Sequence, residues 1–414
     1  MRFSACMKFL FLLIPADLIF SMSHVTAQMP GCTDPLAVNY NQSATVNDGS
    51  CYYNISNIEP LASVVLSPVL SETSGLILWN GNIWTHNDNS DINLYCLDTI
   101  DGRIIRTVAL NGIENKDWEE VSQDKDYIYI GDFGNNSGDR TDLRIFRIAK
   151  NSLTEGFRQV DSIKFSYPDQ IDFTPAAYKT DFDCEAFIVA GDSIYLFSKQ
   201  WISKRTNIYS LPKRPGNYVA KPGSTLDVNG LITGATFQES KRIAVLSGYS
   251  EKLVPFIYLL YDFEGNDFFS GNKRKVEVRL PYHQIEGIAT SGGVKFYISN
   301  EHFSLEPFIN VRQKLHVLDL SPFLGRYLNL PLPHPDEENN FIIYPVPAHD
   351  YIAVRSLATL LPVKFALVTL NGGIIKRGIL AEEYTTINIS RLPSGTYILK
   401  IGDQKKHSYK IIKE

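Results

Sequence analysis

Residues 183–201 read DCEAFIVAGDSIYLFSKQW. Two apolar runs rich in aromatic and β-branched residues flank the turn formers Gly191 and Asp192. Runs of this kind, joined by a two-residue turn containing glycine, predict a β-hairpin. The acidic Glu185 stands near the start of the first run, and the polar pair Ser198-Lys199 ends the second.

The same plan recurs along residues 61–320. Each unit begins with a small or acidic residue, continues with two apolar strands and ends with a further strand. The units are residues 71–98, 117–148, 183–212, 232–263 and 285–320. Repeats of about 45–65 residues with three or four short strands predict the blades of a β-propeller. We therefore predict an all-β chain with five blades, with room for a sixth, divergent blade between the second and third units.

Three further strands complete this picture. Residues 160–168 and 275–281 are predicted to form outer, fourth strands. The early run SVVLSPVL (63–70) precedes the first unit, and we expect it to complete the last blade. Such pairing closes the ring and removes exposed sheet edges. The predicted propeller therefore spans residues 58–329.

The composition supports this class and limits the partners. With 44% hydrophobic and 21% charged residues in 414, wholesale disorder is excluded. The 12% aromatic content, with 27 Gly and 21 Pro, favours strands and turns. The net charge is −5, although residues 340–414 carry 10 Lys/Arg against 5 Asp/Glu. The acidic body argues against a nucleic-acid partner and is compatible with cation binding.

The first 27 residues predict a signal peptide. Arg2 and Lys8 give a positive start, residues 9–20 are apolar apart from Asp17, and small residues precede Gln28. The apolar run is too short for the roughly 20 residues that a membrane helix needs. No later stretch is suited to cross a bilayer, so we expect no transmembrane span.

The cysteines divide into two kinds. Cys32 and Cys51 enclose a small polar loop, and because export permits disulfides we predict one between them. Cys96 and Cys184 each lie in a strand-like segment, where we expect buried thiols.

Residues 28–57 form a polar module around these two cysteines. Its residue order resembles a short Cys-bounded module of secreted Bacteroidetes proteins. Two interpretations stay open: a disulfide-tied spacer with solvated polar groups, and a weak calcium site. The oxygen ligands in the second case are Asp34, Asn39, Asn41 and Asp48.

The C-terminal part differs in pattern. Residues 330–340 read as a linker rich in proline and then acidic, and seven short strands in residues 341–414 predict a small Ig-like β-sandwich. This segment resembles the C-terminal sorting domain of the type IX secretion system. The motifs that carry the resemblance are Tyr344-Pro345-Val346-Pro347, Leu370-Asn371-Gly372-Gly373, Leu392-Pro393-Ser394-Gly395-Thr396-Tyr397 and the end from Lys410 to Glu414. Val346 departs from the family pattern, which has Asn between the two prolines.

The resemblance implies export in two steps. A signal peptide would lead the chain to the periplasm, and the type IX machinery would then deliver it to the cell surface or the medium. Whether the sorting domain is cleaved is left open, and the propeller is the cargo.

Aligning the units on their first strand brings five residues to one position: Ser74, Glu119, Glu185, Thr233 and Glu286. The innermost strands of a propeller line its central channel, so three glutamates are expected to face one another there. Facing carboxylates are costly unless a cation or a basic side chain balances them. Calcium is the cofactor that such oxygen ligands would suit.

The ends of the second strands give a second set of candidates. Asp88, Asp132, Asn300 and Glu301 are candidate oxygen ligands at the channel mouth, His86 and His302 are possible general bases, and Lys199 is placed to neutralise a carboxylate. A purely structural alternative is that these carboxylates bind backbone amides of the next blade.

The units also resemble, loosely, six-bladed propellers of the gluconolactonase, strictosidine-synthase-like and phytase-esterase-like kinds. The residues concerned are Trp84-Thr85-His86-Asn87-Asp88, Asp117-Trp118-Glu119 and Asp183-Cys184-Glu185-Ala186. We expect a binding or interaction module with an unknown ligand, because no complete catalytic constellation is visible. The alternative is a calcium-dependent hydrolase or lactonase with its site in the channel and with catalytic residues that the sequence does not name.

Overall fold

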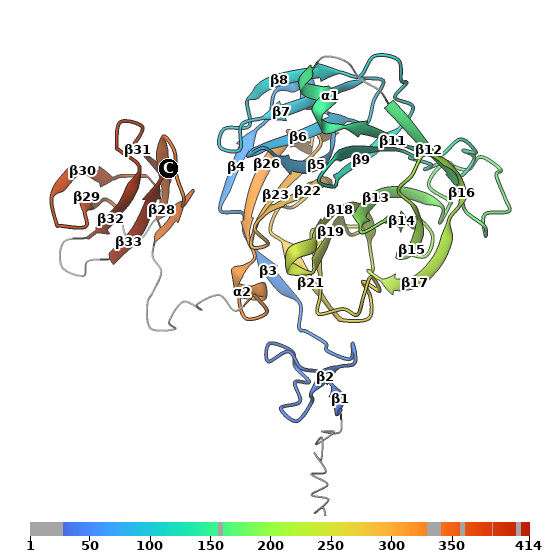
Figure 1. Ribbon diagram of the computed structural model, residues 1–414, viewed down its shortest axis with the longest axis horizontal. Helices are drawn as coiled ribbons and strands as arrows, with labels where there is room; N and C mark the ends of the chain where they lie inside the picture. Colours follow the sequence, from blue (N-terminus) through green and yellow to red (C-terminus); the bar gives the residue numbers. More distant parts are fainter. Residues whose placement is uncertain (1–27, 156–159, 329–340, 357–360, 383, 403–406) are drawn as a thin grey trace, which may run out of the picture.

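A computed structural model describes residues 28–155, 160–328, 341–356, 361–382, 384–402 and 407–414. The predicted signal peptide (1–27) and linker (330–340) lie outside these residues. The described part contains a β-propeller, a β-sandwich and a small N-terminal module (Figure 1). The predicted all-β fold is therefore confirmed.

The propeller has five blades in the described residues, and the room left for a sixth blade is not used. Blade I holds β5 (Thr73–Trp79), β6 (Asn82–Asn87), β7 (Asn93–Leu97) and β8 (Ile104–Ala109). Blade II holds β9 (Trp118–Gln123), β10 (Tyr127–Asp132), β11 (Arg144–Ala149), β12 (Val160–Ser166) and β16 (Gly216–Val219). Blade III holds β13 (Asp183–Ala190), β14 (Ser193–Lys199), β15 (Arg205–Pro212) and β17 (Lys221–Asp227).

Blades IV and V each recruit a strand from the start of the chain. Blade IV holds β18 (Leu231–Gln238), β19 (Ile243–Tyr249), β20 (Pro255–Tyr261), β21 (Asn272–Val278) and β3 (Ser56–Ile58). Blade V holds β22 (Ile285–Ser291), β23 (Lys295–Asn300), β26 (Lys314–Asp319) and β4 (Ala62–Val65). Since β4 pairs antiparallel with β26, the early strand closes the ring as predicted. The predicted outer strands are β12 and β21.

Hydrophobic packing holds the ring together. Five buried clusters lie between neighbouring blades, one for each pair of blades in the described residues. Each innermost strand contacts the innermost strands of the two adjacent blades, and β22 contacts β5 across the closure. The short elements around the blades are α1 (Lys150–Glu155), α2 (Ser321–Leu324), the 3-10 turns η1 (Pro68–Leu70) and η2 (Glu239–Lys241), and the hairpin β24 (Phe303–Leu305) to β25 (Ile309–Val311).

The C-terminal part is the predicted seven-stranded sandwich. One sheet holds β27 (Phe341–Tyr344), β28 (Tyr351–Ser356) and β31 (Tyr384–Asn388). The other holds β30 (Ile374–Leu380), β29 (Val363–Thr369), β32 (Gly395–Ile401) and β33 (His407–Lys413). The two sheets enclose a core of their own that includes Phe365, Leu367 and Leu399.

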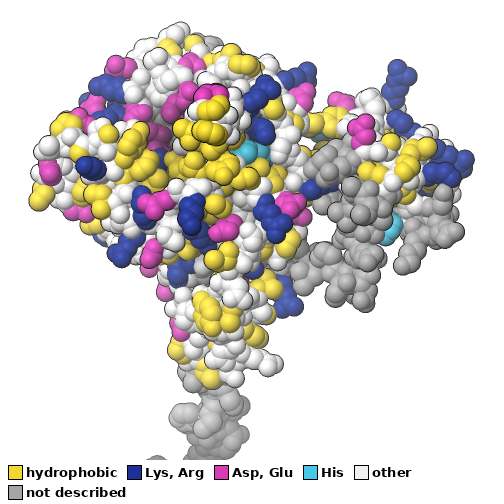
Figure 2. Space-filling view, turned by 180° about the vertical axis from the view of Figure 1, so that it is seen from behind, with side chains coloured by type: hydrophobic (Ala, Val, Ile, Leu, Met, Phe, Trp, Pro, Cys, Tyr) yellow, Lys and Arg dark blue, Asp and Glu magenta, His cyan; other side chains and the backbone are white. Residues whose placement is uncertain are grey.

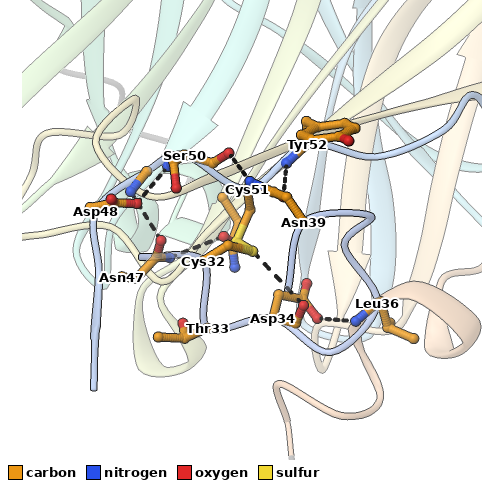
Figure 3. Close-up of a disulfide and its surroundings, with 12 residues drawn as sticks. Cys32, Thr33, Asp34, Leu36, Asn39, Asn47, Asp48, Ser50, Cys51 and Tyr52 are labelled. Atoms are coloured by element: carbon orange, nitrogen blue, oxygen red, sulfur yellow. Dashed lines mark hydrogen bonds between the residues drawn. A yellow bond between two sulfur atoms is a disulfide. The ribbon is translucent and has the colours of Figure 1, made fainter. Parts of the chain in front are cut away.

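The N-terminal module contains β1 (Pro30–Gly31), β2 (Val46–Asn47) and the predicted disulfide between Cys32 and Cys51 (Figure 3). The module is docked on blade IV. Asp34 accepts hydrogen bonds from the hydroxyls of Tyr53 (2.7 Å) and Tyr261 (2.5 Å). Asn47 donates to Asp262 and Asn272, both on the same blade.

The four oxygen-bearing residues of the module are engaged in its own turns. Asp34, Asn39, Asn41 and Asp48 each accept a hydrogen bond from a backbone amide of the module. These hydrogen bonds are what the interpretation as a disulfide-tied spacer predicts. Cys96 and Cys184 are buried thiols, as expected.

Ring closure yields a first prediction. Leu66 follows β4, is 2% exposed and packs between blades V and I. Leu66→Ala should lower the free energy of unfolding of the propeller by about 2–5 kcal/mol, since it opens a cavity at the closure. Urea unfolding followed by tryptophan fluorescence measures this, because all four tryptophans lie between residues 79 and 201. Val65→Ala, at a neighbour 41% exposed, is the matched control and should cost less than about 1 kcal/mol. Equal effects of the two variants would contradict the role given to Leu66.

Candidate functional site

The position aligned across the five units lies at an irregularity of every innermost strand. Cα pairing passes over Glu119, Glu185, Thr233 and Glu286, and in blade I it is irregular directly after Ser74. A β-bulge leaves a residue out of the ladder and redirects its side chain. In blades II to V the same backbone device therefore takes the aligned residue out of the ladder, whereas Ser74 of blade I keeps its pairing with His86.

The two small members of this set connect blades. The hydroxyl of Ser74 donates to the carbonyl of Glu119, which links blades I and II. The hydroxyl of Thr233 donates to the carbonyl of Ile285, which links blades IV and V. For these two residues, the structural role is what the structure shows.

The three glutamates line one cavity of about 550 Å³. Seven carboxylates and two ammonium groups face this space, so acidic groups predominate in its lining. On the face of the molecule seen in Figure 2, by contrast, acidic and basic side chains are interspersed. The lining residues are Asp88, Asp117, Glu119, Asn136, Tyr178, Glu185, Lys199, Trp201, Lys204, Leu231, Tyr249, Ser250, Glu251, Leu253, Gln284, Glu286 and Glu301.

Lys199 is the buried cation of the cavity. It forms an ion pair with Glu185, and its Nζ lies 4.6 Å from the ring centroid of Trp201 and 5.6 Å from that of Tyr249. Burial alone would lower the pKa of Lys199, but the acidic groups around it, Glu185 first among them, together outweigh burial and raise this pKa. Burial raises the pKa of Glu185 to about 8 despite the lysine.

Glu119 and Glu286 have no such partner. They are 8% and 7% exposed, and neither side chain has a hydrogen-bond or ion-pair partner among the described residues. Burial, reinforced by the charge of Glu185, raises the pKa of both carboxyls well above the usual range. A Cβ on Gly134 would lie 2.2 Å from Glu119 Oε1 and 2.3 Å from Asp117 Oδ2, so only glycine lets the chain pass these two carboxylates.

A second glutamate of blade II, Glu120, was not identified from the sequence. It is fully buried and accepts hydrogen bonds from the amides of Val121 (3.0 Å) and Ala235 (2.7 Å), the second of which lies on blade IV. Burial raises its pKa, while these amide donors oppose the shift. Glu120 thus connects blades II and IV across the ring axis, whereas the structural role considered for the aligned carboxylates was binding to the next blade. The sequence signal that could have revealed Glu120 is the pair of adjacent glutamates in Asp117-Trp118-Glu119-Glu120.

At the mouth of the cavity three carboxylates converge. Ligand oxygens of Glu72, Asp88 and Glu301 all lie within 4.8 Å of one another. Burial and the neighbouring acids raise the pKa of Asp88 to about 7 and that of Glu301 to about 8. Glu72 was missed from the sequence because it precedes the aligned strand.

Four of the predicted mouth residues do not line the cavity. Asp132 is fully buried and binds Arg140 (3.1 Å) and Arg144 (2.7 Å), so its oxygens are already neutralised. The side-chain amide of Asn300 donates to the carbonyls of Glu301 and Arg312, and its oxygen contacts His316.

The two histidines are also elsewhere. His86 is fully buried against Trp118, and burial lowers its pKa to about 4. His302 is exposed and contacts Asn310 through Nε2. The structure therefore does not bring either imidazole to the cavity.

Comparison with known families identifies the C-terminal part. Residues 342–414 match the family of the secretion system C-terminal sorting domain. These residues are similar to that sorting domain over nearly the whole of the predicted sandwich (341–414). Its motif residues Tyr344, Pro345 and Pro347 lie at and after the end of β27, and Gly395 begins β32. No curated protein matches the chain. No helix among the described residues is long and apolar enough to cross a membrane.

Several solved structures are similar in fold to the chain. Aldose sugar dehydrogenase from Streptomyces coelicolor is 12% identical, with a TM-score of 0.36, and the match covers 62% of this chain and 98% of that one. A putative glucose dehydrogenase from Thermus thermophilus is 9% identical, with a TM-score of 0.35 and coverages of 62% and 99%. PorZ, a surface component of the type IX secretion system of Porphyromonas gingivalis, is 11% identical, with a TM-score of 0.31 and coverages of 83% and 45%. At these TM-scores none of the likenesses bears on the function of the propeller.

The two adjacent glutamates of blade II give a second prediction. Glu120→Gln replaces one acceptor oxygen with an amide donor facing a backbone N–H, so it should lower the free energy of unfolding by about 1–3 kcal/mol. Glu119→Gln is the matched control, and it should be neutral or stabilising because it removes a repelling charge and no hydrogen bond. Urea unfolding, followed by tryptophan fluorescence, measures the free energy of unfolding of both variants. A larger loss for Glu119→Gln would show that the two roles are assigned the wrong way round.

Proposed function

We propose that this chain is an exported protein whose propeller is a binding module, and that its central cavity takes a ligand with a positively charged group. The sorting domain supports delivery to the cell surface or the medium by the type IX machinery. Passage through the periplasm after removal of a signal peptide completes the proposed route.

The observation that carries the binding proposal is the pair Glu119 and Glu286. Both are nine-tenths buried, both face the cavity, and neither has a partner among the described residues. Burying a charged carboxylate without a partner is costly: protonation relieves that cost in the empty cavity, and a positively charged ligand would relieve it in the bound state. A cavity of about 550 Å³ is within the range of small-molecule sites.

The lining favours binding over catalysis. No histidine and no cysteine lines the cavity in the described part of the chain. The one lysine deep in the cavity is held by Glu185 and so is protonated, which suits a structural counter-ion better than a nucleophile.

A calcium-dependent hydrolase or lactonase is the second candidate. Asp117 favours it, because burial and the charge of Asp183 raise the pKa of this carboxyl to about 6, in the range of a general base. Multiple turnover of a lactone by the wild type, abolished in Asp117→Asn, would establish this candidate in place of a simple binding module.

The export proposal predicts that deletion of residues 335–414 leaves the protein in the periplasm of the native host. The physical reason is that the sandwich, which has its own core, is the part read by the outer-membrane machinery. Cell fractionation with immunoblotting measures the distribution against the full-length chain. Full surface delivery of the truncated protein would contradict the proposal.

The binding proposal predicts that spermidine, used as a cationic probe, raises the melting temperature of the purified protein, whereas glucose does not. At 100 times its dissociation constant a ligand adds roughly 2.7 kcal/mol of stability. The double variant Glu119→Gln/Glu286→Gln should lose the shift. Glu251→Gln should keep it, because Glu251 is exposed at the rim and paired with Lys204. An equal shift in the double variant, or none in the wild type, would contradict cation binding in the cavity.

A further inference from the structure

The carboxylates at the cavity mouth come from the two blades that meet where the ring closes. Glu72 immediately precedes β5 and Asp88 immediately follows β6, both in blade I, while Glu301 follows β23 in blade V. Two backbone hydrogen bonds fix these segments. The amide of Asp88 donates to the carbonyl of Glu72 (3.1 Å), and the amide of His302 donates to the carbonyl of Ser71 (2.7 Å).

Asparagine side chains bind backbone carbonyls next to two of the three carboxylates. Asn87 ends β6 and donates to the carbonyl of Val69, and Asn300 ends β23 and donates to the carbonyl of Glu301. In each case an acidic residue follows the asparagine directly: Asp88 in one blade, Glu301 in the other. The remaining blades end the corresponding strand differently, at Asp132, Lys199 and Tyr249, so this arrangement is confined to the closing pair.

A second observation, outside this group, points to a cation. Glu286 is 7% exposed, lines the same cavity as Asp88 and Glu301, and has no hydrogen-bond or ion-pair partner in the described residues. Lys199, the buried cation of the cavity, is already paired with Glu185. The mouth therefore gathers carboxyl groups that no protein cation balances by direct contact.

We propose that Glu72, Asp88 and Glu301 bind one calcium ion that joins blade I to blade V. This inference rests on the proposed function, because the calcium ion would be one positively charged group that the carboxylates of the ligand cavity take up.

Two features favour calcium. Calcium binds oxygen at about 2.3–2.6 Å, so two ligands on opposite sides of one ion are roughly 5 Å apart, and the oxygens here lie within 4.8 Å. Three carboxylates supply up to six oxygens, and water completes a shell of six to eight. An exported protein needs only the affinity of extracellular calcium modules, with dissociation constants of about 10⁻⁴–10⁻³ M.

The test is calcium titration of the purified, chelator-treated protein by isothermal calorimetry, together with melting curves. Wild type should bind one calcium ion and melt at a higher temperature with calcium than with chelator. Glu72→Gln and Glu301→Gln should each weaken calcium binding at least about tenfold. Glu251→Gln, a carboxylate of the same cavity outside the group, is the matched control and should change the affinity less than about twofold.

Three outcomes overturn the proposal: no calcium binding by the wild type, equal weakening in Glu251→Gln, or unchanged affinity in Glu301→Gln. Circular dichroism of each variant checks its fold. If a glutamine variant fails to fold, Glu301→Asp replaces it. The measurement is then terbium luminescence sensitised by Trp201, which lines the cavity. Bound terbium that calcium cannot displace also counts against the site.

The spermidine experiment separates this inference from the proposed function. A spermidine shift without calcium binding refutes the metal site alone. Calcium binding that depends on Glu301, without a spermidine shift, supports the metal site and refutes the cationic ligand.

Discussion

Pairing of the short strand β4 with β26 is the interaction on which the propeller depends. A blade shields its apolar faces only between two neighbours, and the first and last blades become neighbours only when the chain start supplies the outer strand of the last. The closure also places the start of blade I against the end of β23 in blade V. Consequently the carboxylates of Glu72 and Glu301, more than 200 residues apart in sequence, face one another.

The closed ring explains why so much charge is buried. Five strands meet around one axis, and four of them release the aligned residue from pairing at a bulge, while Ser74 of blade I stays paired beside its irregularity. Where the aligned side chain is a hydroxyl, it binds the next blade. Where it is a glutamate, it faces the cavity, and of the three glutamates only Glu185 forms an ion pair with a lysine in the described residues. Residues at equivalent positions therefore differ in their contacts. Ser74 and Thr233 bind a neighbouring blade and are structural, whereas the side chains of Glu119 and Glu286 have no partner in the described residues, so these two are candidate binding residues.

The sequence was sufficient for the fold because period-two alternation and turn residues repeat in every unit. It also placed Glu119, Glu185 and Glu286 at one cavity, since repeated strands occupy equivalent positions. It failed for Asp132, whose arginine partners lie in the following loop and strand and could serve equally well on the surface. It failed for His86 because alternation does not tell which face of β6 is buried against Trp118. It missed Glu72 because that residue precedes the aligned strand, and its position depends on closure.

Glu119 and Glu120 show how one backbone irregularity divides two identical side chains between two tasks. Consecutive residues of a strand point to opposite faces, so a regular ladder would already separate them. The bulge at Glu119 adds to this by releasing its backbone from pairing, while Glu120 stays opposite Gly131 and in the ladder. Glu120 can then meet amides of its own and the opposite blade, which a flexible or exposed carboxylate could not do. Glu120, whose two oxygens both accept hydrogen bonds, thus links blades across the ring axis. The side chain of Glu119 beside it has no hydrogen-bond partner in the described residues and is available to a ligand in the cavity.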